Sequence, residues 1–454
     1  MRDTPKVGIS GVRGIAGTSF TPQLATSFAQ AFGTFVGPGS VLVGRDTRRS
    51  GPMIENAVIT GLQSTGCKPL LAGIVPTPTL LLMTPRLGAR GAIAITASHN
   101  PEQWNALKFV DENGTFLSPT RASELYDVYH QREFRMVPEH DLSEPQVPHD
   151  CLEPHFQEIL KYVDAEAICE ASIKIAVDCC NGVGAIHTPR FLEQLNCDFV
   201  ACGMSVTGQF DREPEPLPQN LGALRELVTS HGADIGFAQD PDGDRLAIVD
   251  EKGTPIGEDL TVALAVRQVL DAHEKGPVVV HLSTSRCVRA VAETYGCHVH
   301  LSKIGEINVT ERMLETGAVV GGESNGGVII PAIHPCRDSY TAMAVVLELL
   351  AKTGKRVSEL RAEIPTYVLV RDKISIQSED AVNALRGVRH HYKDCDLNVI
   401  DGVHVDFGDR WFHTRISNTE PVVRITAEAP DEDGAARLIK EVRAVIEGIA
   451  NIEH

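Results

Sequence analysis

The stretch VLVGRDTRRSGPMIENAVITGLQSTGCKPLLAGIVPT, residues 41–77, sets the fold class of this chain. Two apolar runs, 41–46 and 69–77, have the length and composition of buried strands. Between them lies an amphipathic segment of helical length. A strand, a helix and a second strand in this order are typical of a mostly parallel sheet with crossover helices. The stretch therefore predicts an α/β domain.

The same alternation of short apolar runs and amphipathic segments continues to about residue 350. A passage rich in proline and glutamate, 137–153, is typical of a linker. The last hundred or so residues instead show alternating strand patterns and one final helix. We therefore predict three similar α/β domains with mixed sheets and a smaller C-terminal α+β domain. Their limits are 1–150, 151–254, 255–366 and 367–454.

The composition is that of a soluble globular protein, with 43% hydrophobic and 22% charged residues among 454. No apolar run approaches the ~20 residues of a membrane span, and the N-terminus lacks the apolar core of a signal peptide. We expect a cytoplasmic protein that does not bind membranes. The eleven cysteines are odd in number and scattered, which indicates neither a disulfide framework nor a zinc site.

The net charge of −18, from 42 basic and 60 acidic residues, argues against nucleic acid as a partner. Proteins that bind nucleic acid present a basic face. The same charge means that an anionic substrate would need a local basic pocket. Four loops show where such a pocket could be built.

The first loop ends the apolar run GAIAITAS with Ser98 and His99, and Pro101 closes it. Nucleophiles in α/β proteins lie at the carboxyl ends of strands. Ser98 has no G-x-S-x-G frame, so a hydrolase-type nucleophile elbow is not indicated. A serine here could accept and hold a phosphoryl group. The alternative is a turn residue without chemistry.

The second loop, QDPDGDR, places Asp240, Asp242 and Asp244 at alternate positions. Their mutual repulsion is costly unless a cation neutralises it, and oxygen ligands at this density favour magnesium or calcium. The alternative is a solvated acidic turn. A calcium EF-hand does not fit, because Arg245 replaces the glycine of its sixth position and the flanks are strands.

The third loop, GGESNGG, combines glycines that allow close backbone approach with Glu323, Ser324 and Asn325. Sugar hydroxyls need this mixture of donors and acceptors. Lys303 follows a nearby strand, where a cation could face the same cleft. The alternative is a flexible glycine loop.

The fourth loop, RISNTEPVVR, is dense in hydrogen-bond donors, which suit a phosphate group. These donors are Arg415, Ser417, Asn418, Thr419 and Arg424. The alternative is an ordinary β-turn. Taken together, the four loops provide a serine that can carry phosphate, a cation site, a sugar loop and a phosphate clamp. The basic residues that accompany them are Arg13, His99, Lys108, Arg245, Lys303, Arg415 and Arg424.

These loops resemble those of the α-D-phosphohexomutases, and TASHNP and DPDGDR are highly specific motifs. The similarity covers nearly the whole chain in the family's order. It implies four domains around a central cleft, with Ser98 as the phosphoserine. It implies Mg²⁺ held by Asp240, Asp242, Asp244 and the phosphate on Ser98.

The resemblance also implies roles around the substrate. Glu323, Ser324 and Asn325 would bind the sugar, with Lys303 and Arg245 also at the substrate. The phosphate that is not transferred would be held by Arg415, Ser417, Asn418 and Thr419, with Arg424 beside them. Lys108 matches the general acid/base, and Arg13 would face the active serine. Whether Lys108 or His99 is the base stays open.

Within the family, GISGVRGIAG, PEPLPQNL, KIGEINV and RISNTEP are similar to phosphoglucosamine mutases of the archaeal-like branch. The chain departs from the common pattern at three places. In the sugar loop G-E-x-S-G-H, Asn325 replaces the serine and Gly327 replaces the histidine. The Asn-Gly that usually precedes the catalytic lysine is Asn105-Ala106. These changes bear on which hexose is preferred.

We therefore expect a phosphohexomutase that interconverts hexose 6-phosphate and hexose 1-phosphate through a bisphosphorylated sugar, which also acts as activator. The expected reaction is glucosamine 6-phosphate to glucosamine 1-phosphate, and phosphoglucomutase/phosphomannomutase activity is the alternative. The rival functions are a phosphatase and a non-catalytic sugar-phosphate-binding protein. The partner would be the hexose phosphate, bound by a monomer or a homodimer.

Overall fold

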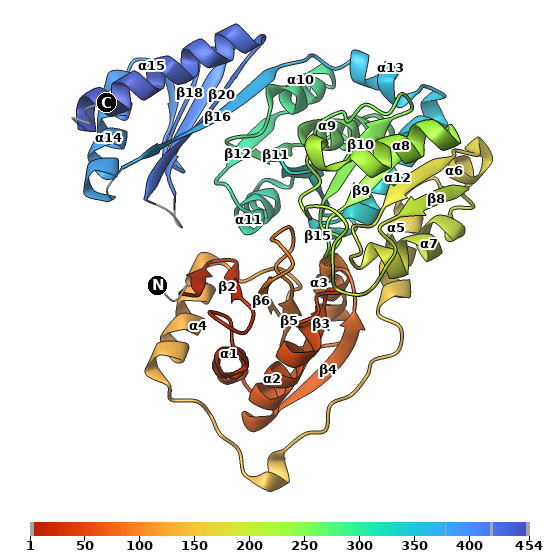
Figure 1. Cartoon of the computed structure of the whole chain (residues 1–454), viewed down its shortest axis with the longest axis vertical. Helices are drawn as coiled ribbons and strands as arrows, with labels where there is room; N and C mark the ends of the chain where they lie inside the picture. The colour runs from red at the N-terminus through yellow and green to blue at the C-terminus, as the bar shows by residue number, and fades with distance from the viewer. Residues whose placement is uncertain (1–3, 377, 418–420, 451–454) are drawn as a thin grey trace.

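The computed structural model describes residues 4–376, 378–417 and 421–450. Four sheets form along the chain, three with helices on their faces and a fourth with two helices (Figure 1). The expected fold class, three α/β domains with mixed sheets and a C-terminal α+β domain, is confirmed. The domain limits given above stay predictions.

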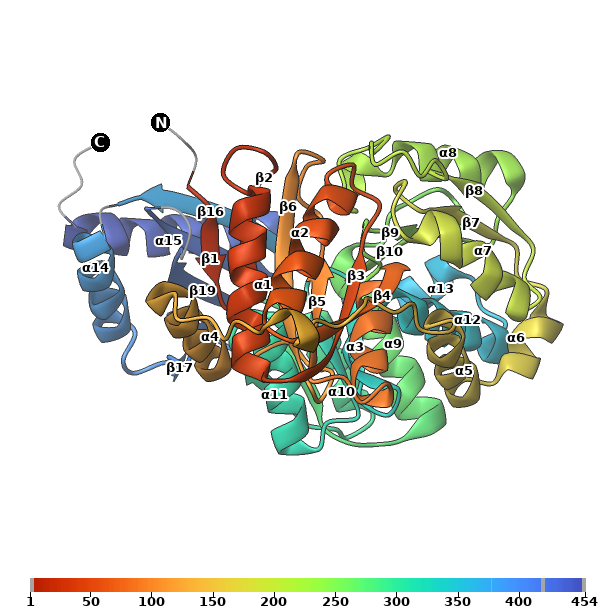
Figure 2. The same ribbon diagram turned by 90° about the horizontal axis from the view of Figure 1, so that it is seen from below.

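The first sheet has the order β1-β2-β6-β5-β3-β4. Strand β3 is parallel to β4 and β5, whereas the other pairs are antiparallel. The strands are β1 (Lys6–Gly8), β2 (Gly11–Ile15), β3 (Gly39–Arg45), β4 (Cys67–Ile74), β5 (Gly91–Ile95) and β6 (Trp104–Asp111). The helices are α1 (Pro22–Val36), α2 (Gly51–Ser64), α3 (Thr77–Arg86) and α4 (Pro119–Gln131). Figure 2 shows α1 and α2 side by side on this sheet.

The predicted linker does not run free of the first sheet. After the short turn η1 (Glu139–Asp141), Gln146 exchanges backbone hydrogen bonds with β4: its N–H donates to Pro69 at 2.9 Å, and Leu71 donates to its carbonyl at 2.7 Å. The passage therefore pairs with the edge strand of the sheet and covers it.

The second sheet has the order β10-β9-β7-β8, with β10 antiparallel to β9. Its strands are β7 (Ile175–Asp178), β8 (Phe199–Cys202), β9 (Ile235–Gln239) and β10 (Leu246–Asp250). Its helical elements are α5 (Leu152–Tyr162), α6 (Ala165–Ala171), α7 (Gly184–Gln194), η2 (Pro218–Asn220) and α8 (Gly222–His231).

The third sheet has the order β12-β11-β13-β14-β15. Its strands are β11 (Val278–His281), β12 (Val299–Ser302), β13 (Val320–Glu323), β14 (Gly327–Ile330) and β15 (His334–Arg337). Its helical elements are α9 (Glu258–Gln268), η3 (Val269–His273), α10 (Arg286–Thr294), α11 (Glu306–Thr316), α12 (Ser339–Thr353) and α13 (Val357–Ala362). Helix α12 is buried on all sides from Ser339 to Leu350. One continuous apolar core joins the second and third units, from Leu152 to Ile364.

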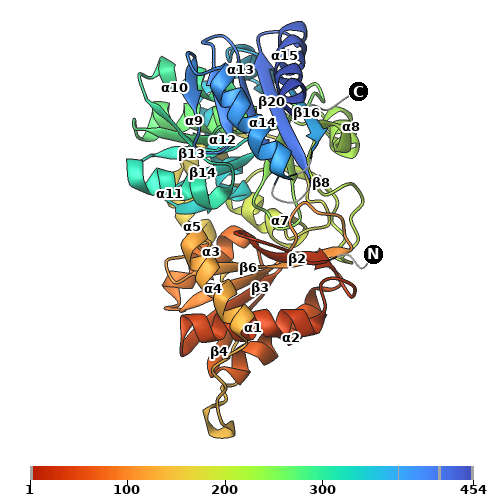
Figure 3. The same ribbon diagram turned by 90° about the vertical axis from the view of Figure 1, so that its left-hand side faces the viewer.

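The fourth sheet, β16-β20-β19-β18-β17, is antiparallel throughout. Its strands are β16 (Val368–Ser375), β17 (Asp396–Asn398), β18 (Val403–Asp406), β19 (Trp411–Ile416) and β20 (Val422–Ala429), with helices α14 (Ser378–His391) and α15 (Glu432–Ala450). The first and fourth units have apolar cores of their own. Figure 3 shows the first unit below the other three. Within the described part of the chain, no helix combines the length and the apolar character needed to cross a bilayer.

Candidate active site

The four predicted loops meet at one cavity of about 1300 Å³. Its lining draws on all four units, with Ser98 from the first, Arg245 from the second, Glu323 from the third and Arg415 from the fourth. The aspartate loop lies next to the lining, because Asp240 and Asp242 bond to residues that do line the cavity. Loops that are far apart in sequence therefore form a single site.

Ser98 lies at the carboxyl end of β5 in a left-handed conformation, with φ of 47°. Such a conformation costs a non-glycine residue free energy and persists only where the surroundings fix it. The Ser98 N–H donates to Thr96 Oγ1 at 2.9 Å. Its hydroxyl donates to Asp240 Oδ2 at 2.7 Å, which joins the serine loop to the aspartate loop.

Arg48 holds the serine loop from behind, and sequence reasoning missed it. Its side chain is fully buried and its Nε bonds to Asp46 at 2.9 Å. The remaining N–H groups donate to backbone carbonyls of the loop at 2.6–3.0 Å, those of Ser98, Asn100, Pro101 and Trp104. All five guanidinium donors are thus used. No local sequence pattern around Arg48 indicates this role, because its backbone partners in the serine loop lie about fifty residues further along the chain.

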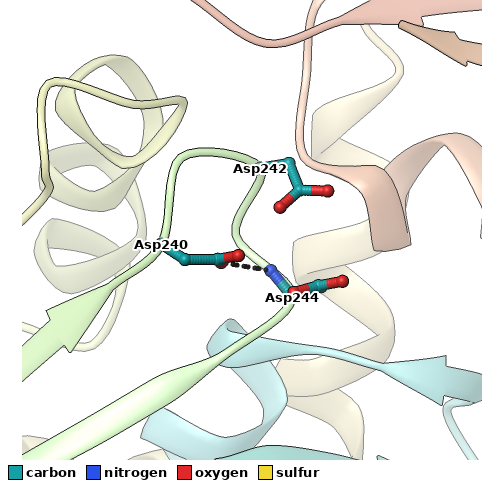
Figure 4. A group of neighbouring side chains, drawn as sticks. All are labelled: Asp240, Asp242 and Asp244. Atoms are coloured by element: carbon teal, nitrogen blue, oxygen red, sulfur yellow. Dashed lines mark hydrogen bonds between the residues drawn. The ribbon is translucent and has the colours of Figure 1, made fainter. Parts of the chain in front are cut away.

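The aspartate loop is the turn between β9 and β10 (Figure 4). Asp240 Oδ1 accepts the backbone N–H groups of Asp244 and Arg245 at 3.1 and 3.2 Å. Gly243 makes the turn possible with φ of 71°. Asp242 Oδ2 accepts from Thr77 Oγ1, at the start of α3, at 2.9 Å.

The three carboxylates could hold a metal ion. Each offers one oxygen, and these oxygens lie within 4.8 Å of one another in a buried group. Asp242 Oδ1 and Asp244 Oδ1 are buried and have no hydrogen-bond partner. Buried carboxylate oxygens left unpaired are costly, and a hard cation is the ligand that they suit. The solvated acidic turn considered above does not describe this loop, because all three side chains are buried.

Charges set the protonation of this cluster. Burial, and then the charges of Asp244 and Asp242, raise the pKa of Asp240 well above its ordinary value. Burial alone would raise the pKa of Asp242, but the ammonium of Lys108 at 2.9 Å lowers it. The same pairing raises the pKa of Lys108 despite the opposing effect of burial. Lys108 therefore stays protonated beside the aspartates.

His99 lies next to the serine and lines the cavity. Its Nδ1 is buried without a hydrogen-bond partner. Burial first, and then the charges of Arg245 and Arg337, lower the pKa of His99 to about 2. The imidazole is therefore neutral at physiological pH.

The sugar loop joins β13 to β14, and its first residue, Glu323, is buried. Glu323 accepts from Arg337 Nη1 at 2.6 Å and from the Gly305 N–H at 3.1 Å. Asn325 is partly engaged within the turn: its Nδ2 donates to Glu323 at 3.3 Å and its Oδ1 accepts from Gly327 N–H at 3.1 Å. The hydroxyl of Ser324 lies 3.1 Å from His281 Nε2.

The fourth unit contributes cations to the cavity from three neighbouring strands. Arg415 on β19 is paired in register with Arg424 on β20, and both line the cavity with Ser417. Asn418 and Thr419 lie outside the described residues. Arg371 and Lys373 on β16 also line the cavity, and sequence reasoning missed them. Their spacing of two residues on a strand puts them on one face, which is the signal that could have revealed them.

The other predicted cations divide between the cavity and the surface. Arg13 on β2 and Arg245 after the aspartate loop line the cavity. Lys303 is exposed and is not among the residues that line it. The local basic pocket that an acidic chain needs for an anionic substrate is thus present, and four of its cations, Arg371, Lys373, Arg415 and Arg424, belong to the fourth unit.

Comparison with known protein families gives four matches that follow the four units. They are to phosphoglucomutase/phosphomannomutase alpha/beta/alpha domains I, II and III, over residues 4–136, 153–253 and 257–367, and to the C-terminal domain over residues 366–445.

Two relatives match almost from end to end. A phosphoglucomutase/phosphomannomutase of Thermococcus kodakarensis is 36% identical over 440 residues, covering 95% of this chain and 96% of the relative. A probable phosphoglucosamine mutase of Methanopyrus kandleri is 36% identical over 445 residues, covering 96% of each. Among solved structures, a phosphoglucomutase/phosphomannomutase family protein of Burkholderia thailandensis superposes with a TM-score of 0.86 at 26% identity, covering 97% of this chain and 96% of that one.

Proposed function

The chain belongs to the phosphoglucomutase/phosphomannomutase family, and we propose that it moves phosphate between the 6- and 1-oxygens of an aldohexose phosphate. The observation that carries this proposal is the position of Ser98. Its hydroxyl lies at the cavity, 2.7 Å from a carboxylate of a buried triad that could hold a metal ion. Cations from the fourth unit line the same cavity.

In this reaction Ser98 carries the phosphoryl group. A hydroxyl of the hexose monophosphate attacks the phosphorus of phosphoserine. The new P–O bond forms to the sugar, the Ser98 Oγ–P bond breaks, and the hydroxyl proton passes to a nearby base. The bisphosphorylated sugar then turns over in the cavity and returns its other phosphate to Ser98. The same bisphosphate, bound from solution, would phosphorylate a free Ser98 and act as activator.

Two residues beside the serine can move the proton. Lys108 is held protonated by Asp242, which suits a donor to the leaving oxygen. His99 is neutral and has a buried ring nitrogen without a partner. Lys108 is therefore the candidate for the general acid, whereas His99 is available as a base but a weak one, because its pKa is low. Arg13, which lines the cavity from β2, would neutralise charge on the phosphoryl group.

The metal that we propose is Mg²⁺, held by Asp240, Asp242 and Asp244 together with the phosphate on Ser98. The unpaired buried oxygens of Asp242 and Asp244 support this assignment. When bound, the ion would supply positive charge that stabilises the phosphoryl group in transfer.

The phosphate that stays on the sugar would bind to the fourth unit. Arg415, Ser417 and Arg424 line the cavity there, and we propose that Asn418 and Thr419 of the same loop join them. With one phosphate bound to the fourth unit, the other end of the hexose would be left to react at Ser98, which lines the same cavity.

We propose glucosamine phosphate as the preferred substrate, with glucose and mannose phosphates as the alternative. The two relatives described above have equal identity to this chain and carry different names, so their names do not decide. The sugar loop offers Glu323, Ser324 and Asn325 to the cavity. One N–H and one lone pair of the Asn325 amide are used within the turn, which leaves a donor and an acceptor for the sugar. We also propose that the protein is cytoplasmic and is a monomer or a homodimer.

The decisive experiment is a coupled assay with the 6-phosphates of glucosamine, glucose, mannose and N-acetylglucosamine, in the presence of Mg²⁺ and the matching 1,6-bisphosphate. We expect hexose 1-phosphate as product, with the highest kcat/KM for glucosamine 6-phosphate. Release of inorganic phosphate in place of isomerisation would indicate a phosphatase. Binding without turnover of any of these sugars would indicate a non-catalytic binding protein.

A further inference from the structure

Arg337, at the end of β15, bridges the aspartate loop and the sugar loop. Its Nη2 donates to Asp244 Oδ2 at 2.5 Å and its Nη1 donates to Glu323 Oε2 at 2.6 Å. Its Nε donates to Glu306 at 3.1 Å, and its backbone N–H donates to the other oxygen of Glu306 at 3.0 Å. The arginine is buried and lines the cavity. One guanidinium thus pairs with three carboxylates, those of Asp244 in the aspartate loop, Glu323 on β13 and Glu306 on α11, of which the first two are buried.

Gly327 provides the space that Arg337 occupies. A methyl group added at position 327 would lie 2.2 Å from Arg337 Cδ and 2.8 Å from its Cγ. Such distances are far below van der Waals contact, which lies near 3.5–4.0 Å between carbon atoms. The backbone of Gly327 is not in the left-handed region, so conformation alone does not demand glycine there. Glycine is required there because the side-chain methylene groups of Arg337 leave no room for a larger residue.

This contact gives a physical meaning to one departure from the common sugar-loop pattern. Where that pattern has a histidine, this chain has Gly327, and the side chain of Arg337 fills the place where the substituent at 327 would begin. The basic side chain at this point of the site is therefore that of Arg337 on β15 and not one from the sugar loop.

We infer that Gly327 and Arg337 act as one unit that sets sugar affinity: Gly327 admits the stem of Arg337, and Arg337 positions Glu323 for the sugar in fixed relation to Asp244. Arg337 is a positioning residue in this account, because it acts through the two carboxylates. The inference rests on the proposed function, since it takes Glu323 as a ligand of the hexose.

The test is a double-mutant cycle on the binding of glucosamine 6-phosphate, measured by calorimetry in buffer free of divalent cations. The variants are Gly327→Ala, Arg337→Ala and the double variant. Each single change should weaken binding about 10-fold or more, because Glu323 loses a charge-assisted bond. The affinity of the double variant should lie within about 2-fold of that of Arg337→Ala, because the arginine side chain with which the added methyl group clashes is then absent. A penalty that came from Asn325 Oδ1, 3.0 Å from the added methyl, would persist in the double variant.

Two controls and a rescue separate positioning from general damage. Gly222→Ala adds a methyl where nothing lies within 4 Å, and Arg190→Ala removes a surface arginine that bridges Asp150 and Glu153. Neither control should change affinity. Millimolar guanidinium should restore binding to Arg337→Ala but not to Gly327→Ala, in which the arginine is still present.

If Arg337→Ala does not fold, Arg337→Lys and its double variant with Gly327→Ala replace it. Lysine keeps the charge and the side-chain methylene groups but cannot bond to three carboxylates, so Arg337→Lys should bind glucosamine 6-phosphate more weakly. Adding Gly327→Ala to this variant should weaken binding further, because the methylene groups that clash are still present. Additive penalties in the alanine cycle, no rescue by guanidinium, or a lysine variant in which Gly327→Ala costs nothing would each overturn the inference. Absence of binding to the wild-type protein would instead overturn the proposed function on which it rests.

Discussion

At the scale of single residues, the chemistry is concentrated in side chains whose partners are distant in sequence. Ser98, Asp240, Asp242 and Asp244 could be predicted, because each stands in a short motif whose composition is costly without a function. Arg48 and Arg337 could not. Each is one arginine in a stretch without unusual composition, and its partners become visible only when the chain is folded. Buried arginines that organise loops are the part of this site that local pattern does not reveal.

Arg48→Lys tests whether the serine loop is held from behind. Lysine has three donors on a single nitrogen and cannot reproduce five bonds in a fork, so the loop should shift. A displacement of about 1 Å at a reacting group can cost about 100-fold in rate, so we expect kcat to fall about 100-fold with a small change in KM. Steady-state kinetics and far-UV circular dichroism provide the measurement. Arg45→Lys, a neighbour that bonds to Glu55, is the matched control. Wild-type kcat in Arg48→Lys would contradict the role.

Arg415→Ala tests the phosphate clamp of the fourth unit. A charge-assisted hydrogen bond to phosphate contributes roughly 1.5–3 kcal/mol, so KM for the hexose monophosphate should rise ~10- to 100-fold. The control is Arg437→Ala, which removes an exposed arginine on α15 of the same unit. If KM for Arg415→Ala equalled that of the control, the fourth unit would not hold the substrate phosphate.

At the scale of elements, the sequence predicted the strand–helix–strand stretch of β3, α2 and β4 because strands and helices have different apolar periods. It also located the serine, aspartate and sugar loops at strand ends. The pairing of the 137–153 passage with β4 was not foreseen, since one backbone pair at a sheet edge leaves no periodic signal. The cations Arg371 and Lys373 were not foreseen either, because they lie within a strand and not in a loop of unusual composition.

The turn between β13 and β14 is the element where we expect sugar preference to be set. Asn325→Ser replaces an amide that has one N–H and one lone pair free for the sugar with a single rotatable hydroxyl. We expect the ratio of kcat/KM for glucosamine 6-phosphate to that for glucose 6-phosphate to change severalfold, while the phosphate content of Ser98 stays constant. Specificity constants for both sugars in both proteins provide the comparison. Identical ratios would place sugar selection elsewhere in the cavity.

At the scale of the whole molecule, the site depends on how the units meet. The second and third units share one core, and the fourth has a core of its own. The first unit has its own core and a second apolar cluster that includes Cys336 of the third unit. Arg286 on α10 bonds to Asp406 on β18 at 2.8 Å, and Ser283 bonds to His413 at 2.7 Å. The number and class of the domains followed from the sequence. The sharing of one core did not, because apolar periodicity identifies buried faces but not which faces meet.

His334 gives the interface between the first and third units a pH dependence. Its Nε2 lies 2.7 Å from the carbonyl of Gly114, and burial lowers its pKa from the ordinary value of 6.5 to about 4. Between pH 4 and pH 6.5, His334 therefore binds a proton more readily in the unfolded chain than in the folded protein. The stability that neutral His334 provides is therefore present above pH 6.5 and is lost as the pH falls to about 4, by about 3 kcal/mol at most.

His334→Gln keeps a donor for the Gly114 carbonyl but does not titrate. We therefore expect the thermal unfolding midpoint of this variant to fall less than that of the wild type as the pH is lowered from 6.5 to 4. His140→Gln, on an exposed side chain, is the control and should leave the profile unchanged. The measurement is the midpoint as a function of pH for the three proteins. Parallel profiles for wild type and His334→Gln would show that this histidine does not contribute.

Phosphorylation of Ser98 is the step on which the proposed reaction depends. The protein is incubated with glucosamine 1,6-bisphosphate and Mg²⁺, quenched, and analysed by intact mass and peptide mapping, with Ser98→Ala beside it. We predict one phosphate on the peptide that contains Ser98, its persistence during turnover of glucosamine 6-phosphate because the bisphosphorylated sugar returns a phosphate to Ser98, and neither phosphate nor turnover in Ser98→Ala. Turnover at the wild-type rate in Ser98→Ala, or a wild-type protein that turns over while Ser98 never carries phosphate, would contradict the mechanism.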